Sequence, residues 1–417
     1  MELEEHLFRH EAGRLVSILA RLFGLSNLAL AEDVVQDAFC RALETWKFHG
    51  VPANPTAWLM ATAKNRARDV LRRERATRPA SLELSPDLQS EWTLAAAVDE
   101  AFDAGGIRDA QLRMMFSCIH PRLAEEAQLA LVLHLLCGFS IDETAAAFLK
   151  GADAMEKRIG RAKKTLAGSR QLFDLGGAND LSARQPAVLR VLYLMFNEGY
   201  HGASQHSVVR ADLCGEALRL LGLLIENPQT VTPAGHALAA LMQFHSARLP
   251  GRVDASGDLV PFALQDRSRW DRNHIATGHR HLASSATGDE LTAYHLEAAV
   301  AALHADAARA EDTDWAGVVS LYDSLLRLQP TPVVALARAI AVAERDGPAQ
   351  GLAELSRIAD RERLTRYPFY FSAAGEFELR LGHTGAARLM FESALKRARN
   401  PAERRFLEER LRQCNPA

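Results

Sequence analysis

The chain has 417 residues, of which 48% are hydrophobic, and a formal net charge of -3 at pH 7. This length exceeds what one hydrophobic core normally serves, so we expect about two to four domains in an ordinary soluble globular protein. No apolar run approaches the ~18 residues of a membrane-spanning helix, and the acidic N-terminus is unlike a secretory signal, so we predict a cytoplasmic protein with no membrane partner. The five cysteines are scattered and form no CxxC pair, which argues against a disulfide framework or a zinc site.

Two amphipathic helices are predicted before residue 45. Apolar residues recur at the 3.6-residue period from Leu15 to Leu22, and a second apolar stripe runs from Val34 to Leu43. The start of the second helix is acidic on its outer face, where the positive end of the helix dipole favours negative charge. The residues of this outer face are Glu32, Asp33, Gln36 and Asp37.

A loop is expected over residues 47–55, because this stretch contains one glycine and two prolines. The helix that follows enters a basic stretch, and residues 64–78 include seven basic residues and two acidic ones. Trp46, Phe48 and Trp58 surround the loop. Aromatic rings beside cations can stack on unpaired bases, although the commoner role of tryptophan is to fill a core between helices.

A second basic stretch covers residues 150–170, again with seven basic residues and two acidic ones. Between Arg78 and Arg108 the pattern inverts, with six acidic residues and no lysine or arginine. One basic cluster is usually a solvated face. Two of them, in separate helical modules on either side of an acidic tether, favour a long polyanion that is contacted at two places.

Residues 140–166 predict two short helices joined at residues 149–151, the arrangement of a helix-turn-helix. Ser140 and Glu143 form a capping-box pattern at the start of the first helix, and Gly151 is expected to supply a positive φ in the turn. The second helix is basic and is suited to the major groove of duplex DNA. The alternative is a solvated basic helix.

Three blocks of this sequence resemble, in order and in spacing, those of extracytoplasmic-function (ECF) sigma factors. They are residues 31–39 (AEDVVQDAF), 54–59 (NPTAWL) and 63–73 (AKNRARDVLRR). Residues 155–163 are similar to the recognition helix of sigma region four, so the resemblance covers residues 10–170. It implies a sigma factor that binds core RNA polymerase and promoter DNA and directs transcription initiation.

The resemblance also implies roles for particular residues. The acidic helix face would dock on the β′ clamp of RNA polymerase, whose β flap is a further contact, through Asp33, Gln36, Asp37 and Phe39. The loop and the basic helix would hold the minus-ten element through Lys47, Asn54, Lys64, Asn65, Arg68, Arg72 and Arg73. The helix-turn-helix would read the minus-thirty-five element through Lys150, Lys157, Arg158, Arg161, Lys163 and Lys164. Lys157 stands where many relatives carry Ser, so the sequence that it reads cannot be taken from them.

More than half of the chain follows this region, and residues 173–311 are predicted to be helical. Residues 196–200 (FNEGY), 254–259 (DASGDL) and 265–271 (QDRSRWD) resemble segments of the ECF group that carries a long tetratricopeptide-like (TPR-like) extension. Ser256 departs from that pattern, which usually has Asp. The resemblance implies a surface that couples the extension to the sigma domains through Asp254, Gly257, Asp258, Leu259, Arg267, Arg269 and Trp270. The alternative is a polar turn and a helix start in which Asp266, Arg267, Arg269 and Asp271 pair among themselves.

An internal repeat is predicted in residues 312–417. The pattern that begins at Val318 returns at Ala387, with a degenerate copy near the midpoint at Ala353. Both steps of this pattern are close to the period of a TPR repeat, which is roughly 34 residues. Gly382 is expected to end a helix. We therefore expect three TPR-like helix pairs, which can bind a peptide or protein partner in a concave groove, although their apolar stripe is first of all the core of each repeat.

No enzymatic motif stands out in the sequence. Five histidines lie between His274 and His304, but they show no HExxH or paired histidine–carboxylate spacing. GxSxG, P-loop and GxGxxG patterns are also missing. We therefore predict that the protein is not an enzyme and that it holds no cofactor and no metal.

Together these patterns predict an all-α chain. Its segments are a sigma region 2 domain (1–76), an acidic linker (77–107), a region 4 helix-turn-helix domain (108–172), a helical extension domain (173–311) and TPR-like repeats (312–417). The leading hypothesis is a sigma factor regulated in cis by its extension. The alternative is a helical adaptor that binds a protein through the repeats and keeps the sigma-like half as a duplex-DNA anchor. The acidic docking face and the acidic linker favour the first, because a plain DNA anchor has no use for them.

Overall fold

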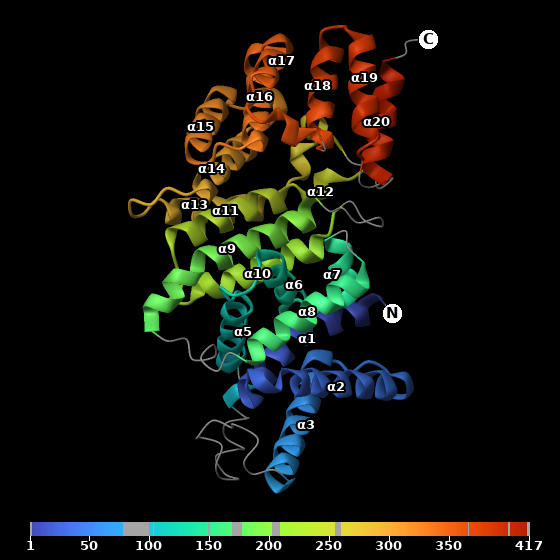
Figure 1. The fold of residues 1–417 in the computed structure, drawn as a ribbon, viewed down its shortest axis with the longest axis vertical. Coiled ribbons are helices and arrows are strands. Elements are labelled where there is room, and N and C mark those ends of the chain that lie inside the picture. Colours follow the sequence, from blue (N-terminus) through green and yellow to red (C-terminus); the bar gives the residue numbers. More distant parts are fainter. Residues whose placement is uncertain are drawn as a thin grey trace. The chain divides into compact units, whose positions relative to one another are not determined.

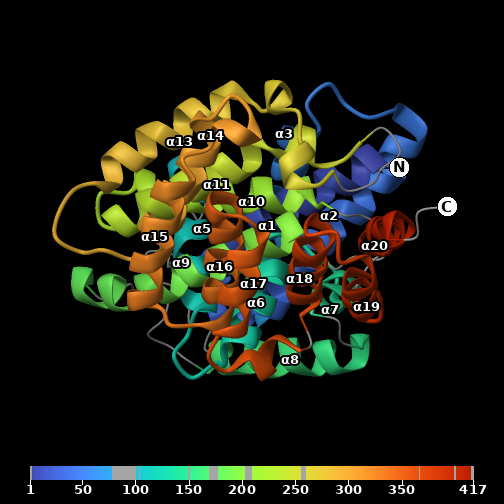
Figure 2. The same cartoon turned by 90° about the horizontal axis from the view of Figure 1, so that it is seen from above.

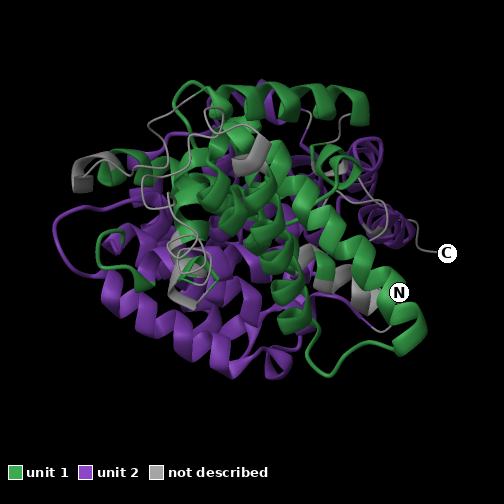
Figure 3. Cartoon of the chain, turned by 90° about the horizontal axis from the view of Figure 1, so that it is seen from below, with its two compact units in different colours: residues 1–195, 226–230 green, residues 196–225, 231–417 purple. Residues whose placement is uncertain are grey.

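The computed structural model describes residues 2–77, 100–102, 104–148, 151–168, 177–201, 209–254, 260–365, 367–398 and 401–414. All regular elements in these residues are helices, which confirms the predicted all-α class (Figure 1). The chain divides into two compact units: unit 1 comprises residues 1–195 and 226–230, and unit 2 comprises residues 196–225 and 231–417 (Figure 3). No helix in the described ranges is both long enough and apolar enough to cross a membrane. The five segment boundaries remain predictions.

Unit 1 is organised around its first helix. Its elements are α1 (Glu2–Phe23), α2 (Leu28–His49), α3 (Pro55–Thr77), α5 (Ala104–Cys118), α6 (Glu125–Leu131), a π-helix (Val132–Leu136), α7 (Ile141–Ala147), α8 (Ala152–Ala167) and α9 (Gly177–His201), which continues into unit 2. Leu15, Ile18, Leu19 and Leu22 of α1 are buried, as their helical spacing predicts. Because α1 contacts α2, α3, α5 and the π-helix, these elements share one core.

The backbones of α1 and the π-helix approach one another closely in this core. A Cβ atom added at Gly13 would lie 1.8 Å from the carbonyl oxygen of Leu136. Only a glycine allows two backbones to come this near, since any side chain would overlap the carbonyl group. The sequence pattern did not indicate this contact, because the π-helix is a local departure from the regular hydrogen-bond ladder.

Unit 2 begins with a helical layer. Its elements are α10 (Ala211–Glu226, with its last residue in unit 1), α11 (Pro233–Ala247), α12 (Leu249–Arg252), two 3-10 turns (Phe262–Leu264 and Arg267–Arg269), α13 (Arg272–Ser285) and α14 (Ala293–Asp306). Helix α11 contacts both α13 and α14. It is buried on almost every side, including Leu238, Met242 and Phe244, so it forms the centre of this layer.

Helices α15 to α20 occupy the region in which a repeat is predicted (Figure 2). They are α15 (Trp315–Leu328), α16 (Pro332–Asp346), α17 (Pro348–Ser356), α18 (Pro368–Arg380), α19 (Thr384–Leu395) and α20 (Pro401–Gln413), and each contacts the next. The predicted stop at Gly382 is confirmed, because this residue has φ +81° and directly follows the C-cap of α18. The hydrogen bonds from His383 N to Glu378 O (2.9 Å) and from Gly382 N to Leu379 O (3.0 Å) complete a Schellman motif. The assignment of these pairs to the TPR class remains a prediction.

Replacing Gly13 with alanine is expected to destabilise unit 1 by about 1–3 kcal/mol, because the new methyl group forces α1 away from Leu136. The measurement is the free energy of unfolding in denaturant. Gly160→Ala in α8 is the matched control. A Cβ atom at Gly160 meets no atom within 4 Å, so this change should stabilise the helix by about 0.5–1 kcal/mol. Equal effects of the two substitutions would contradict the close approach.

Candidate nucleic-acid interface

The predicted docking face lies on α2. Asp33 and Gln36 are exposed and Asp37 is partly exposed, while Val34, Val35 and Ala38 of the same helix are buried. Asp37 is held by α3, because Arg66 donates from Nε (2.8 Å) and Nη2 (2.7 Å) to its Oδ2 atom. A single carboxylate oxygen accepts both donors, so one side of Asp37 stays open to solvent. The structure therefore brings three of the four predicted residues to one acidic face.

Phe39, the fourth, belongs to an aromatic cluster. Its ring stacks on Phe8 at a centroid distance of 4.8 Å, and Trp46 lies 5.6 Å from Phe8 and 5.5 Å from Trp58. These rings pack with buried Ala42 and Leu59, so the tryptophans fill a core, which is their commoner role. Phe39 lies in this cluster because it is on the apolar side of α2. Its neighbours Asp33 and Gln36 are on the solvent-facing side.

The last turn of α2 leaves one aromatic ring in solvent. The loop predicted over residues 47–55 is shorter than expected, because α2 continues to His49 and Gly50, with φ +76°, ends it. Phe48 is 79% exposed, and Lys47 Nζ lies 5.9 Å from its ring centroid. Asn54 caps α3, since its side-chain oxygen accepts a hydrogen bond from Ala57 N at 3.0 Å and Pro55 is the first helical residue. Asn54 thus has a structural role here beside the DNA contact predicted for it.

The predicted minus-ten residues of α3 share one helix but differ in exposure. Asn65, Arg72 and Arg73 are exposed, while Lys64 and Arg68 are partly buried. Helix α3 also presents Asp69 to solvent, one turn before the exposed Arg72 and Arg73. The structure therefore places a mainly basic face along α3, with its charge concentrated toward the end of the described helix.

The predicted helix pair is formed by α7 and α8, which contact one another. The capping box is confirmed: Ser140 N donates to Glu143 Oε2 (2.9 Å), and Glu143 N donates to Ser140 Oγ (3.1 Å). The positive φ predicted at Gly151 is wrong. Gly151 has φ −73° and ψ 147°, because it is the N-cap of α8 rather than the residue that ends α7.

Helix α8 divides its cations between two environments. Met155, Ile159, Ala162 and Leu166 form a buried stripe. Lys157, Arg161 and Lys164 are exposed on a common face, at spacings of four and three residues. Arg158 instead pairs with Glu126 of α6, and Lys163 pairs with Glu32 of α2. Lys150 lies outside the described residues.

Lys163 joins a network that connects α2, α8 and the π-helix. Its Nζ atom lies 2.6 and 2.9 Å from the two carboxylate oxygens of Glu32 and 3.0 Å from His134 Nε2. His134 Nδ1 lies 2.8 Å from the carbonyl oxygen of Phe139. A carbonyl can only accept, so Nδ1 carries a proton. Nε2 also lies 3.3 Å from Glu32 Oε1; it accepts from Lys163 when the ring is neutral and donates to Glu32 when the ring is protonated. Glu32, Lys163 and His134 are 25%, 24% and 18% exposed, so the network is largely shielded from solvent.

The charge of Glu32 is stabilised by its partners. Burial by itself would raise the pKa of this carboxyl group, but hydrogen bonds and charge from His134 and Lys163 hold the pKa below its ordinary value of 4.5. The sequence pattern does not indicate the Glu32–Lys163, Arg158–Glu126 and Asp37–Arg66 contacts, because the two partners of each pair lie on different helices. It shows Glu32 only as part of an acidic face.

The predicted coupling residues of unit 2 have structural partners. Arg267 is buried and donates to the carbonyl oxygens of His304 (2.8 Å) and Ala307 (3.0 Å) and to Thr313 Oγ1 (3.2 Å). Trp270 is buried and Arg269 is exposed. Gly257, Asp258 and Leu259 lie outside the described residues, and Asp254 ends the segment before them.

The acidic residues of this segment act as caps. Asp266 accepts a hydrogen bond from Ser268 N (2.9 Å), and Asp271 accepts one from Asn273 N (2.7 Å) at the start of α13. The segment is thus a polar turn and a helix start, but its arginines do not pair with these two aspartates as the alternative expected. In the described part of the chain, no three histidine, cysteine or acidic side chains meet as a potential metal site.

Residues 7–77, which form α1 to α3, match the family described as sigma-70 region 2. The N-terminal part of the chain is therefore a sigma-70 region 2 domain, which supports a sigma-70 family factor. The chain also matches a family of unknown function (DUF6596) over residues 184–286. An uncharacterized protein of Rhizobium meliloti, R00370, is 38% identical to it over 386 residues, which cover 92% of this chain and 90% of the relative, so the two belong to one family. No solved structure matches the chain.

The region 2 match gives the site its general role. It supports a sigma factor role in promoter recognition, with core RNA polymerase and promoter DNA as partners. The exposed residues of α2 and the loop before α3 belong to the matched region.

Glu32→Gln is expected to lower the free energy of unfolding at pH 7 by about 1–2 kcal/mol, because it leaves Lys163 without its charged partner. The pKa of Glu32 is lower in the folded state, so its contribution is full above the ordinary value of 4.5 and is lost as the pH falls through the folded-state pKa. Denaturant unfolding between pH 7 and pH 3 measures the difference between the variant and the wild type. Glu44→Gln, an exposed position on the same helix, should show little difference at any pH. A difference for Glu32→Gln that does not depend on pH would exclude the charge network as its cause.

Proposed function

We propose that this protein is an ECF-type sigma factor whose acidic α2 face docks on the β′ clamp of RNA polymerase and whose C-terminal extension regulates it in cis. The observation that carries the proposal is the α2 face itself. Asp33, Gln36 and Asp37 point away from a buried stripe within the part of the chain that matches sigma-70 region 2. Exposed carboxylates at fixed positions on a packed helix suit a charged partner surface.

The minus-ten element is assigned to the loop and α3. Phe48 is the exposed aromatic ring beside Lys47, and base stacking needs an accessible ring next to a cation. Arg72 and Arg73 add exposed positive charge further along α3. This combination supports an unpaired strand that enters at the loop and follows the helix.

The minus-thirty-five element is assigned to α8. Lys157, Arg161 and Lys164 share one exposed face, while Met155 and Ile159 hold the opposite face in the core. A helix that is fixed on one side and cationic on the other is suited to a major groove. Arg158 and Lys163 would join the DNA contact only after leaving Glu126 and Glu32.

The contact between α2 and α8 must open for both elements to be read at once. The names minus-ten and minus-thirty-five place the two elements about 25 base pairs apart. At about 3.4 Å per base pair this separation is roughly 85 Å of duplex. Lys163 Nζ, in contrast, lies 2.6 Å from Glu32. We therefore regard the Glu32–Lys163 contact as a feature of a closed form that separates on the promoter.

Helix α9, the first described helix of the predicted extension, belongs to both compact units. Helix α9 begins in unit 1 and ends in unit 2, and the DUF6596 match starts within it. A continuous helix passes on a displacement better than a flexible linker does. This property supports regulation in cis through α9.

Asp33→Lys is expected to weaken binding to core bacterial RNA polymerase at least tenfold, because it reverses an exposed charge at the centre of the docking face. Fluorescence titration of labelled protein with core enzyme measures the affinity, and transcription in vitro should fall in parallel. Asp289→Lys, the same change at an exposed position of unit 2, serves as the control. Unchanged affinity for Asp33→Lys would refute the docking assignment.

Replacing Lys157, Arg161 and Lys164 together with Gln should reduce the salt dependence of duplex binding. Each cation that neutralises a phosphate contributes about 0.9 to the slope of log K against log salt, so the triple variant should lose about 3 from its magnitude. Fluorescence anisotropy at several salt concentrations gives this slope. Arg158→Gln is the comparison, because Arg158 is already paired with Glu126 and its loss should change the slope little. An unchanged slope in the triple variant would remove α8 from the DNA contact.

A further inference from the structure

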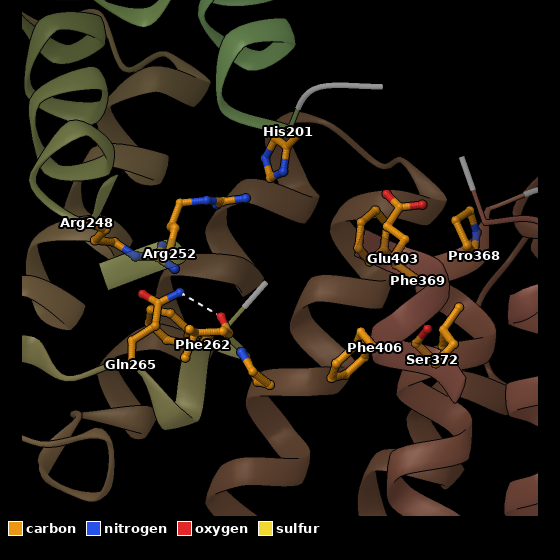
Figure 4. A pocket seen from close by; sticks show the side chains of 13 residues that line it. His201, Arg248, Arg252, Phe262, Gln265, Pro368, Phe369, Ser372, Glu403 and Phe406 are labelled. Atoms are coloured by element: carbon orange, nitrogen blue, oxygen red, sulfur yellow. Dashed lines mark hydrogen bonds between the residues drawn. The ribbon is translucent and has the colours of Figure 1, made fainter. Parts of the chain in front are cut away.

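Unit 2 contains a cavity of about 240 Å³ between the turn-rich segment after α12 and the helices α18 and α20 (Figure 4). Arg248 and Arg252 line one side, beside Phe262. The opposite side is lined by side chains of α18 and α20, including Phe369 and Phe406 (Figure 4). The cavity thus has a cationic end and aromatic walls.

The two arginines are held by rings instead of carboxylates. The guanidinium carbon of Arg248 lies 4.1 Å from the ring centroid of Phe262 and 5.5 Å from that of Trp270, and that of Arg252 lies 3.9 Å from the ring of Tyr200. Neither arginine forms an ion pair with any acidic residue that the structure describes. Glu403, the acidic residue of the lining, pairs with neither of them.

The arginines also have unused hydrogen-bond donors. The Nε atoms of both Arg248 and Arg252 are buried and meet no hydrogen-bond acceptor among the residues that the structure describes. A buried donor without a partner costs about 1–3 kcal/mol, and more when the group is charged. Ring contacts stabilise the positive charge from above the guanidinium plane, but they do not satisfy the N–H donors in that plane.

The neighbouring histidines His245 and His304 add no charge of their own. Burial, with the charges of Arg248 and Arg267, lowers the pKa of His304 to about 3, and burial beside Arg248 lowers the pKa of His245 well below its usual range. Both rings are therefore neutral near pH 7. Burial also lowers the pKa of Arg248 to about 10, which still leaves it charged. The cationic end of the cavity is left with positive charge that no described group neutralises.

We propose that this cavity binds a small organic anion, a carboxylate or phosphate attached to an apolar body. The anionic group would accept hydrogen bonds from Arg248 and Arg252, whose planar donor sets match both kinds of oxyanion. The apolar body would lie between Phe262, Phe369 and Phe406. The volume is below the ~300–1,000 Å³ of sites for drug-sized ligands, so the ligand is small.

This assignment also explains why the segment around Arg248 to Trp270 carries so many charged and aromatic residues. Arg267 and the caps at Asp266 and Asp271 fix the fold of the segment. The Nε donors of Arg248 and Arg252, in contrast, find no acceptor in the described part of the chain. Their uncompensated charge is costly to the folded state, and a bound anion would remove that cost.

Isothermal titration calorimetry on the full chain tests the proposal with phenyl phosphate and benzoate as probes, benzyl alcohol as the neutral probe and inorganic phosphate as the probe without an apolar body. We expect saturable one-to-one binding of at least one aromatic anion, weaker binding of inorganic phosphate and none of benzyl alcohol. Comparison of phenyl phosphate with benzoate identifies the anionic group. The measurement needs no polymerase, so its outcome is independent of the proposed function.

Arg252→Gln should weaken binding of the better probe at least tenfold, whereas Arg345→Gln, on exposed Arg345 that pairs with Asp346, should leave it unchanged. Ser372→Phe provides a second test that keeps both arginines, because the larger side chain fills the cavity from α18. Circular dichroism confirms the fold of each variant. Equal binding by wild type, Arg252→Gln and Ser372→Phe would overturn the proposal, as would binding of benzyl alcohol with the affinity of the anions, or no binding of either aromatic anion.

Discussion

The contact of the α1 backbone with the carbonyl group of Leu136 determines the arrangement of unit 1. With only a hydrogen atom at Gly13, α1 lies directly on the π-helix. The π-helix carries His134, and His134 is the point at which Glu32 of α2 and Lys163 of α8 meet. The close fit of Gly13 against Leu136 in the core thus positions the Glu32–Lys163–His134 network near the surface. Because Lys163 pairs with Glu32 and Arg158 with Glu126, the exposed cations of α8 are Lys157, Arg161 and Lys164.

Local features of unit 1 and unit 2 could be predicted from the sequence because they depend on neighbouring residues. The capping box at Ser140 and Glu143 and the helix stop at Gly382 involve residues within one helical turn. The buried stripe of α1 follows from the helical period of its apolar residues. The positive φ predicted at Gly151 was wrong for a local reason as well, because a glycine between two helices can either end the first helix or cap the second.

The candidate site was harder to predict because its side chains find partners in other helices. The sequence shows that Arg158 and Lys163 are basic and follow the spacing of a recognition helix, but not that Glu126 and Glu32 face them. Phe39 sits next to acidic residues in the sequence, yet its ring packs on Phe8, which precedes it by a full helix. Such pairings depend on tertiary packing, which periodicity does not reveal.

The Glu32–Lys163 contact has a thermodynamic consequence for the proposed closed form. Glu32 is adjacent to the docking residue Asp33, and Lys163 belongs to the helix assigned to DNA. If both polymerase and promoter require this contact to open, whichever binds first removes part of the cost for the other. The two ligands then favour one another by the same factor, which is tenfold for every ~1.4 kcal/mol of the shared opening energy. A single ion pair inside one small unit would in this way make polymerase binding and promoter binding cooperative, although the two partners touch different helices.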